Sequence, residues 1–158
     1  KIEELWLNCS AVRKNLIMNM FGVINDEVFT AENPDAVIFT QPFSEDGIIS
    51  EREKIELYGH ILKKEKCVIK PHPRDLTDYS LFFPEVKVLS GHVPIELYSI
   101  MGMKFKKVYT IFSTSVFGLP YSPEIHFLGT KSHPALLKHF GLIEYKNGKI
   151  TGNIMPPQ

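Results

Sequence analysis

A histidine flanked by prolines and cations follows a short apolar run near the middle of the chain. Residues 70–75 read Lys-Pro-His-Pro-Arg-Asp and come directly after the apolar residues 67–69. Open α/β folds bind ligands beyond the carboxyl ends of their strands, and the prolines restrict the backbone on both sides of His72. Lys70 and Arg74 favour an anionic ligand such as a phosphate. The alternative is a structural histidine, but its place at a strand end favours function.

An acidic pair stands in a second loop, between the predicted strand 36–40 and the helix that follows it. Glu45 and Asp46 precede Gly47. Such a sequence is common in ordinary turns. Acidic neighbours repel each other, however, so partial burial would raise the pKa of one of them, as a general base requires.

Two further loops carry polar residues after predicted strands. Glu96 stands at a predicted helix start, where it could either stabilise the helix dipole or accept hydrogen bonds from a ribose. The hydroxyl residues Ser113, Thr114 and Ser115 could cap a helix or bind an anion. Because all four loops leave a parallel sheet at the same edge, their joint placement favours a binding site over four unrelated structural features.

The elements that position these loops follow from hydrophobic patterning. Continuous apolar runs predict strands over residues 36–40, 66–70, 86–89, 107–111 and 125–128. Helices are predicted over 50–64, 94–101 and 132–140, the first with a capping box formed by Ser50 and Glu53. Wholly apolar strands that alternate with helices indicate an α/β fold, with a parallel sheet covered on both faces.

The chain divides into three predicted parts. Residues 1–35 form a helical segment and linker, residues 36–145 the α/β domain, and residues 146–158 a tail with a turn and a frayed end. Residues 2–24 are predicted to be helical, and their candidate packing positions are Leu5, Leu16, Ile17 and Met20. No predicted sheet lies beneath this segment, so we hypothesise that it packs on a partner subunit, as in a homodimer.

The composition of the chain argues against several classes of protein function. The 158 residues include 18 basic and 18 acidic side chains, and this balance argues against a nucleic-acid-binding protein. Cys9 and Cys67 are predicted to be free, buried thiols in a reducing compartment. No set of His, Cys, Asp and Glu has the spacing of a metal site, and no apolar run is long enough to span a bilayer. The chain starts at Lys1 rather than Met, so we expect it to be a piece of something longer.

The four loops together resemble motifs of bacterial sialyltransferases, most closely the lipooligosaccharide type, glycosyltransferase family 52. Residues 45–47 resemble the family's acidic pair before glycine, and His72-Pro73 resembles its His-Pro motif. Residues 113–115 are similar to its serine-rich phosphate motif, and residues 93–96 to the segment whose glutamate holds the nucleoside. The match covers roughly residues 36–130. It implies a two-domain GT-B enzyme, of which this chain is the Rossmann-like, nucleotide-binding half.

The resemblance also implies a reaction and a set of roles. The full protein would transfer sialic acid from CMP-sialic acid to a sugar hydroxyl of a capsule or lipooligosaccharide, with inversion and without an essential metal or other cofactor. Glu45 or Asp46 would take the acceptor proton, with Glu45 favoured by a small margin. His72, made partly cationic by nearby Asp75, would stabilise or protonate the departing phosphate. The nucleotide-binding residues would be Lys70, Pro73, Arg74, Pro94, Ile95, Glu96, Ser113, Thr114 and Ser115.

Two other functions fit the same residues. Polyol-phosphate polymerases of cell-wall synthesis use another cytidine donor and also carry Lys-Pro-His-Pro stretches and serine-rich loops. A CMP-binding or assembly module without turnover of its own is the other alternative. The resemblance implies a location in the bacterial cytoplasm, and the sequence leaves open a peripheral association with the inner face of the membrane.

Overall fold

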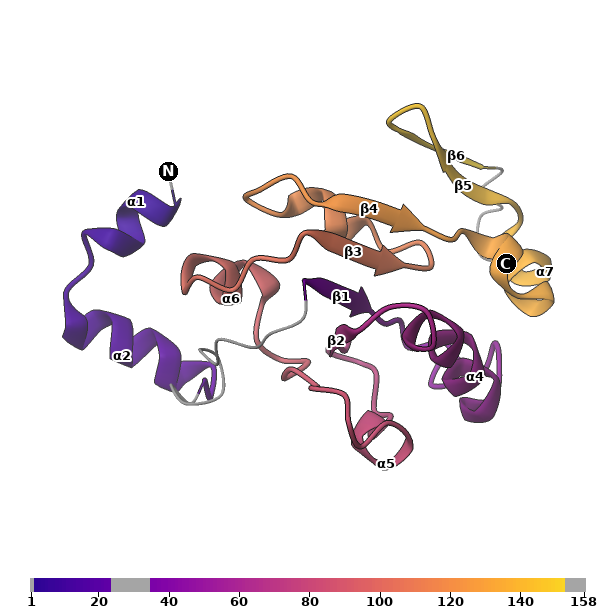
Figure 1. The fold of residues 1–158 in the computed structure, drawn as a ribbon, viewed down its shortest axis with the longest axis horizontal. Helices are drawn as coiled ribbons and strands as arrows, with labels where there is room; N and C mark the ends of the chain where they lie inside the picture. Colours follow the sequence, from indigo (N-terminus) through magenta and orange to yellow (C-terminus); the bar gives the residue numbers. More distant parts are fainter. Residues whose placement is uncertain (1, 24–34, 153–158) are drawn as a thin grey trace.

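The computed structural model describes residues 2–23 and 35–152, and its centre is a four-stranded parallel sheet (Figure 1). The strands are β1 (Ala36–Phe39), β2 (Cys67–Lys70), β3 (Lys107–Thr110) and β4 (Glu124–Phe127), in the order β2-β1-β3-β4. Phe39 is in register with Lys70 on one side and with Thr110 on the other. The chain therefore leaves β1 towards β2 and later returns to the opposite side of β1, which is the kind of switch point where α/β sheets bind ligands.

Helices cover both faces of this sheet, so the predicted α/β class is confirmed. They are α4 (Glu51–Leu62), α5 (Tyr79–Phe82), α6 (Ile95–Ile100) and α7 (Pro134–Phe140), with short 3-10 turns at η1 (Thr114–Gly118) and η2 (Thr130–Ser132). The predicted capping box is present, because the Ser50 hydroxyl accepts from the Glu53 amide and the Glu53 carboxylate accepts from the Ser50 amide.

The core lies in two layers that follow the two-residue period of the strands. Val37 and Phe39 point into the layer on the α6 side. Ala36 and Ile38 point into the opposite layer, beneath α4 and α7. Both faces of β1 are thus fully buried, which explains why the strand is apolar throughout rather than alternating.

Two predicted segments near the sheet differ from expectation. Residues 86–89 do not form a strand: only Val88 bridges to Ile69, whose amide and carbonyl bond to Lys87 and Leu89. This segment lies beside β2 and pairs with it in parallel at that one residue only. The turn expected at 146–149 is present, but it joins a hairpin of β5 (Ile143–Lys146) and β6 (Lys149–Gly152) that was not predicted.

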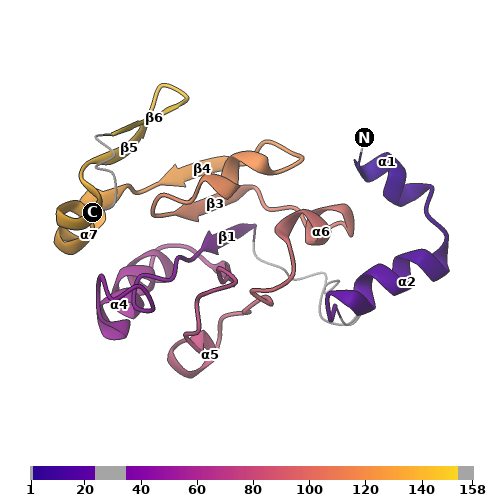
Figure 2. The ribbon, with the colours of Figure 1, turned by 180° about the vertical axis from the view of Figure 1, so that it is seen from behind.

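The N-terminal segment is two helices rather than one. α1 (Ile2–Leu7) and α2 (Ala11–Met20) are separated at Ser10, whose hydroxyl caps α2 by accepting from the Arg13 amide. Both helices lie at one end of the sheet, and α1 contacts α6 (Figures 1 and 2). No helix in the described ranges is long and apolar enough to cross a membrane.

Of the four packing positions predicted for this segment, only Ile17 packs within this chain. Leu5, Leu16 and Met20 are 73%, 60% and 75% exposed, whereas Trp6 and Ile17 pack against the core. The break at Ser10 rotates α2 relative to α1, so a single helical period cannot describe both. The predicted linker lies almost entirely outside the described residues, as does the expected frayed end at 155–158.

Candidate active site

A cavity of about 300 Å³ lies at the carboxyl edge of the sheet, where β1, β2 and β3 end. The sequence-predicted residues that line it are Lys70, His72, Pro73, Pro94, Ile95, Glu96, Ser113 and Ser115. The lining residues that the sequence did not single out as binding residues are Phe39, Thr40, Pro71, Gly91, His92 and Val93. Three of the four predicted loops therefore meet at one cavity, as the parallel topology requires.

Lys70, the last residue of β2, brings a buried ammonium group to this cavity. It is only 6% exposed, and its Nζ donates to the carbonyl oxygens of Pro71 (3.0 Å) and Gly91 (3.1 Å). Among the described residues no carboxylate lies within 4.0 Å of that Nζ. Burial lowers the pKa of Lys70 to about 8, although the charge of Glu96 acts in the opposite direction. An ammonium has three N–H donors, so one is left for an anionic ligand, whose charge would favour the protonated form.

His72 lies two residues after Lys70, on the loop that follows β2, and a backbone contact fixes its tautomer. The Arg74 amide donates to His72 Nδ1 at 3.1 Å, so Nδ1 must carry the lone pair and the proton of the neutral ring lies on Nε2. Burial and the charge of Arg74 lower the pKa of His72, outweighing the opposite effect of Asp75. The net shift is thus opposite to the upward shift expected from Asp75. Because Nδ1 accepts from the Arg74 amide, the ring offers its Nε2–H as a donor.

The hydroxyl motif and Glu96 complete the lining. Ser113 Oγ and Ser115 Oγ lie 2.7 Å apart, and the Ser113 amide donates to Thr110 Oγ1, which fixes the loop to the end of β3. Thr114 begins η1 and does not line the cavity. Glu96 lies in the first turn of α6, across the cavity from the residues of β2.

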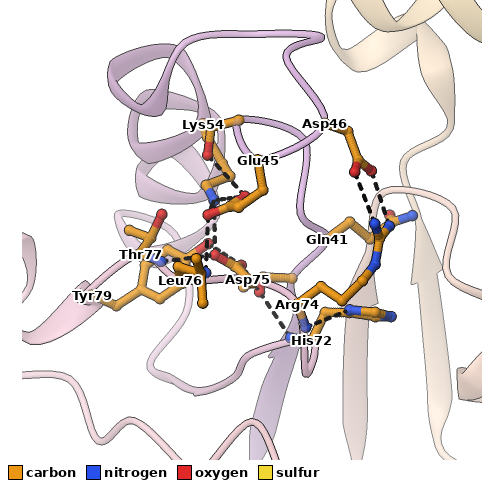
Figure 3. A network of polar contacts seen from close by, with 12 residues as sticks. Gln41, Glu45, Asp46, Lys54, His72, Arg74, Asp75, Leu76, Thr77 and Tyr79 are labelled. Carbon is orange, nitrogen blue, oxygen red and sulfur yellow. Dashed lines mark hydrogen bonds and ion pairs between the residues drawn. The ribbon is translucent and has the colours of Figure 1, made fainter.

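The acidic pair does not line the cavity. Its two carboxylates were predicted to repel each other, but each one faces a different cation (Figure 3). Glu45 is neutralised by Lys54, and Asp46 by Arg74. Burial of Glu45 raises its pKa, but hydrogen bonds from Lys54, the Leu76 amide and Ser44 outweigh burial and lower the pKa to about 2. The expected upward shift by mutual repulsion is therefore wrong for Glu45, because a buried ammonium is closer than its acidic neighbour.

Arg74, predicted to bind the nucleotide, lies outside the cavity lining. Its guanidinium forms a bidentate pair with Asp46, with N–O distances of 3.0 and 3.1 Å, and its side chain is 66% exposed. Asp46, 34% exposed, is thereby held beside the histidine loop, close enough for its charge to act on His72.

Sequence reasoning missed Lys54, which lies at the centre of a buried polar network below the cavity. Its side chain is fully buried, and Nζ contacts Glu45 Oε2 at 2.9 Å and Asp75 Oδ1 at 2.8 Å. The helical period could have found it, since Lys54 shares the i, i+3, i+4, i+7 face of α4 with the buried residues Leu57, Tyr58 and Ile61. A lysine on an apolar face of this kind needs a buried counter-ion.

Two other features bear on the chemistry. In the described ranges 2–23 and 35–152, no group of three or more His, Cys, Asp and Glu side chains is placed to hold a metal ion. Cys9 and Cys67 are both free, but only Cys67 is buried as predicted, whereas Cys9 is half-buried. Burial raises the pKa of the Cys67 thiol to about 12. Neither thiol belongs to the cavity lining.

Comparison with known proteins gives two matches and one negative result. The sequence profile of glycosyltransferase family 52 matches residues 1–136. A Haemophilus influenzae (strain Rd) protein that carries the name "Uncharacterized protein" is 44% identical over 148 residues, which cover 92% of this chain and 48% of that relative. The chain thus spans about half the length of the curated relative it matches. No solved structure matches it.

Proposed function

This chain belongs to glycosyltransferase family 52, and from that membership we propose that it forms the donor-binding half of an inverting sialyltransferase. The whole protein would be a two-domain GT-B enzyme that moves sialic acid from CMP-sialic acid to a sugar hydroxyl of a surface polysaccharide or lipooligosaccharide. The observation that carries the proposal is the cavity at the switch point, which brings Lys70, His72, Glu96 and the Ser113–Ser115 hydroxyl pair together. Use of a CMP-sugar would place the reaction in the bacterial cytoplasm.

In this proposal the cavity binds the nucleotide of the CMP-sugar. The cation in the cavity neutralises charge on the phosphate, and the hydrogen-bond donors in the lining bind the phosphate oxygens. The Lys70 ammonium, His72 Nε2–H and the Ser113 and Ser115 hydroxyls donate to the phosphate oxygens, while Glu96 accepts from the ribose or base. These groups are fixed before the donor arrives, so they stabilise the negative charge that develops on the leaving group. No metal takes part in this scheme.

Asp46, rather than Glu45, is our proposed general base. Lys54 contacts both oxygens of Glu45, at 3.1 and 2.9 Å, and a carboxylate with a pKa of about 2 is a weak base. Asp46 is more exposed, its partner Arg74 stands two residues after His72, and each of its oxygens keeps a lone pair after the Arg74 contact.

Transfer then takes place as a single displacement at the anomeric carbon of the sialic acid. Asp46 takes the proton of the acceptor hydroxyl, and the acceptor oxygen attacks the anomeric carbon of the sialic acid. The bond from that carbon to the phosphate oxygen breaks, and its electron pair leaves with CMP. Positioning of the two substrates supplies much of the acceleration, because CMP is a good leaving group.

Calorimetric titration of the chain with CMP, and with UMP and ADP as controls, tests this proposal directly. We expect selective CMP binding that is weakened about tenfold or more in His72→Ala, because the variant loses a hydrogen-bond donor to a charged group. A donor panel with the full-length protein then separates CMP-sialic acid from CDP-polyol donors. Equal binding of the three nucleotides, or transfer from a CDP-polyol alone, would contradict the proposal.

The pH dependence of CMP binding gives a second test that isolates Lys70. The pKa of this buried lysine is lowered to about 8, so the ammonium that attracts the phosphate is lost as the pH rises through 8. The second phosphate ionisation lies near pH ~6, so CMP keeps a constant charge above pH 7. We expect the affinity measured by calorimetry to fall about tenfold or more between pH 7 and pH 9.5. Lys70→Met should bind weakly at both values, and a parallel decline in Lys70→Met would assign the effect to another group.

A further inference from the structure

We propose that Lys54 is a positioning residue: it joins the acidic loop to the histidine loop and thereby locks the loop that carries Asp46 in place relative to the loop that carries His72. The inference rests on the proposed function, because that function gives Asp46 and His72 their roles. Lys54 itself does not line the donor cavity. It acts from α4, where its side chain reaches both Glu45 and Asp75 (Figure 3).

The first half of the lock joins Lys54 to the acidic loop. Nζ donates to both oxygens of Glu45, and Glu45 Oε1 also accepts from the Leu76 amide at 2.9 Å. Glu45 therefore ties the loop that carries Asp46 to the segment that follows His72. The start of the same loop is tied to α4 as well, because the Gln41 amide donates to the Tyr58 hydroxyl at 2.9 Å.

The second half joins Lys54 to the histidine through two buried acceptors. Nζ donates to Asp75 Oδ1 at 2.8 Å, and the other oxygen of Asp75 accepts from the hydroxyls of Thr40 and Tyr79. Thr40 Oγ1 in turn accepts from the His72 amide at 3.4 Å, and Thr40 lines the donor cavity. A continuous chain of hydrogen bonds therefore runs from Lys54 to the backbone of His72.

Burial makes this arrangement rigid. The Lys54 and Asp75 side chains are both fully inaccessible to solvent, and that of Glu45 is 18% exposed. Water cannot replace the ammonium, so its position and the positions of the two loops depend on one another. A displacement of about 1 Å between reacting groups can lower a rate by about 10²-fold, which is the effect expected when the lock is removed.

The experiment compares Lys54→Met with Lys54→Met/Asp75→Asn in the full-length protein, below the unfolding temperature of each. Methionine fills the space without the charge, and the second substitution removes the unpaired buried carboxylate. We expect kcat to fall about 10²-fold in both variants. The donor KM and the CMP Kd should stay within about threefold, because Lys54 lies outside the donor cavity. The thermal midpoint should fall in the single variant and largely recover in the double variant.

A purely structural role gives a different pattern. If kcat recovers with the thermal midpoint in the double variant, or if CMP affinity falls as far as kcat, the positioning role is wrong. Lys63→Met, an exposed lysine at the end of the same helix, is the matched control and should change neither kcat nor stability.

Amide hydrogen exchange separates the lock from the proposed function. In Lys54→Met we expect faster exchange in residues 41–49 and 71–78 and unchanged exchange in residues 91–100. Unchanged exchange in both loops would overturn the lock. Absence of sialyl transfer by the wild-type protein would instead overturn the proposed function, while the exchange result would still decide whether Lys54 joins the loops.

Discussion

Asp46→Asn, made in the full-length protein, is expected to lower kcat for sialyl transfer by about 10²–10⁴-fold, the usual contribution of a general base. Asparagine keeps the shape of the side chain and one acceptor for Arg74, but it cannot take the proton of the acceptor hydroxyl. CMP affinity should change by less than about threefold, because Asp46 lies outside the donor cavity. Steady-state kinetics together with CMP calorimetry measure the two effects separately.

Glu45→Gln is the matched control for this prediction. Glutamine can still accept from Lys54 and from the Leu76 amide through a carbonyl oxygen at the Oε1 position, so the tie to residue 76 stays while the Oε2 contacts to Lys54 and Ser44 are lost. We expect kcat to fall no more than about tenfold and the acid limb of the pH–rate profile to stay in place. Added formate should restore part of the turnover of Asp46→Gly and none of that of Glu45→Gly. An inactive Glu45→Gln beside an active Asp46→Asn would return the base to Glu45.

Asp75→Ala is expected to cause the largest loss of stability, about 3–5 kcal/mol, because it breaks a buried ion pair. The carboxylate of Asp75 accepts from Lys54, Thr40, Tyr79 and the Thr77 amide. Its removal leaves buried donors unsatisfied and takes from the Lys54 ammonium its fully buried counter-ion. For a domain of this size the thermal midpoint should fall by about 6–20 °C. Urea unfolding of the chain measures the corresponding free energy.

The exposed pair Arg52–Glu56 provides the comparison. These side chains are 88% and 60% accessible, and such an i, i+4 pair contributes only about 0.3–0.5 kcal/mol. Glu56→Ala should therefore leave the midpoint within about 2 °C. Equal destabilisation by the two variants would show that the buried network contributes no more than a surface pair.

Several features of the cavity were predictable because they depend on local sequence. The apolar run before Lys70 makes a strand whose end must carry His72, and the parallel arrangement brings Ser113, after β3, to the same edge, while Glu96 reaches the cavity from the first turn of α6. The capping box at Ser50 likewise depends on residues three apart. The strand prediction for residues 86–89 was wrong because an apolar run this short does not specify how many residues pair with the edge strand, and here Val88 alone forms a bridge.

By itself the sequence determined the α/β class, the loops that carry the polar residues and the family resemblance, because each depends on neighbouring residues and their period. Only the tertiary structure decided which cation neutralises which carboxylate. Lys54 and Asp75 are 21 positions apart, and Arg74 and Asp46 are 28 positions apart. The consequences follow from these contacts: the Lys54 ammonium holds Glu45, Arg74 pairs with Asp46 outside the cavity lining, and the Arg74 amide leaves Nε2–H of His72 as the donor. Which residue pairs with a charged side chain depends on the distance between them in three dimensions and on the exclusion of water. The order of residues along the sequence contains neither.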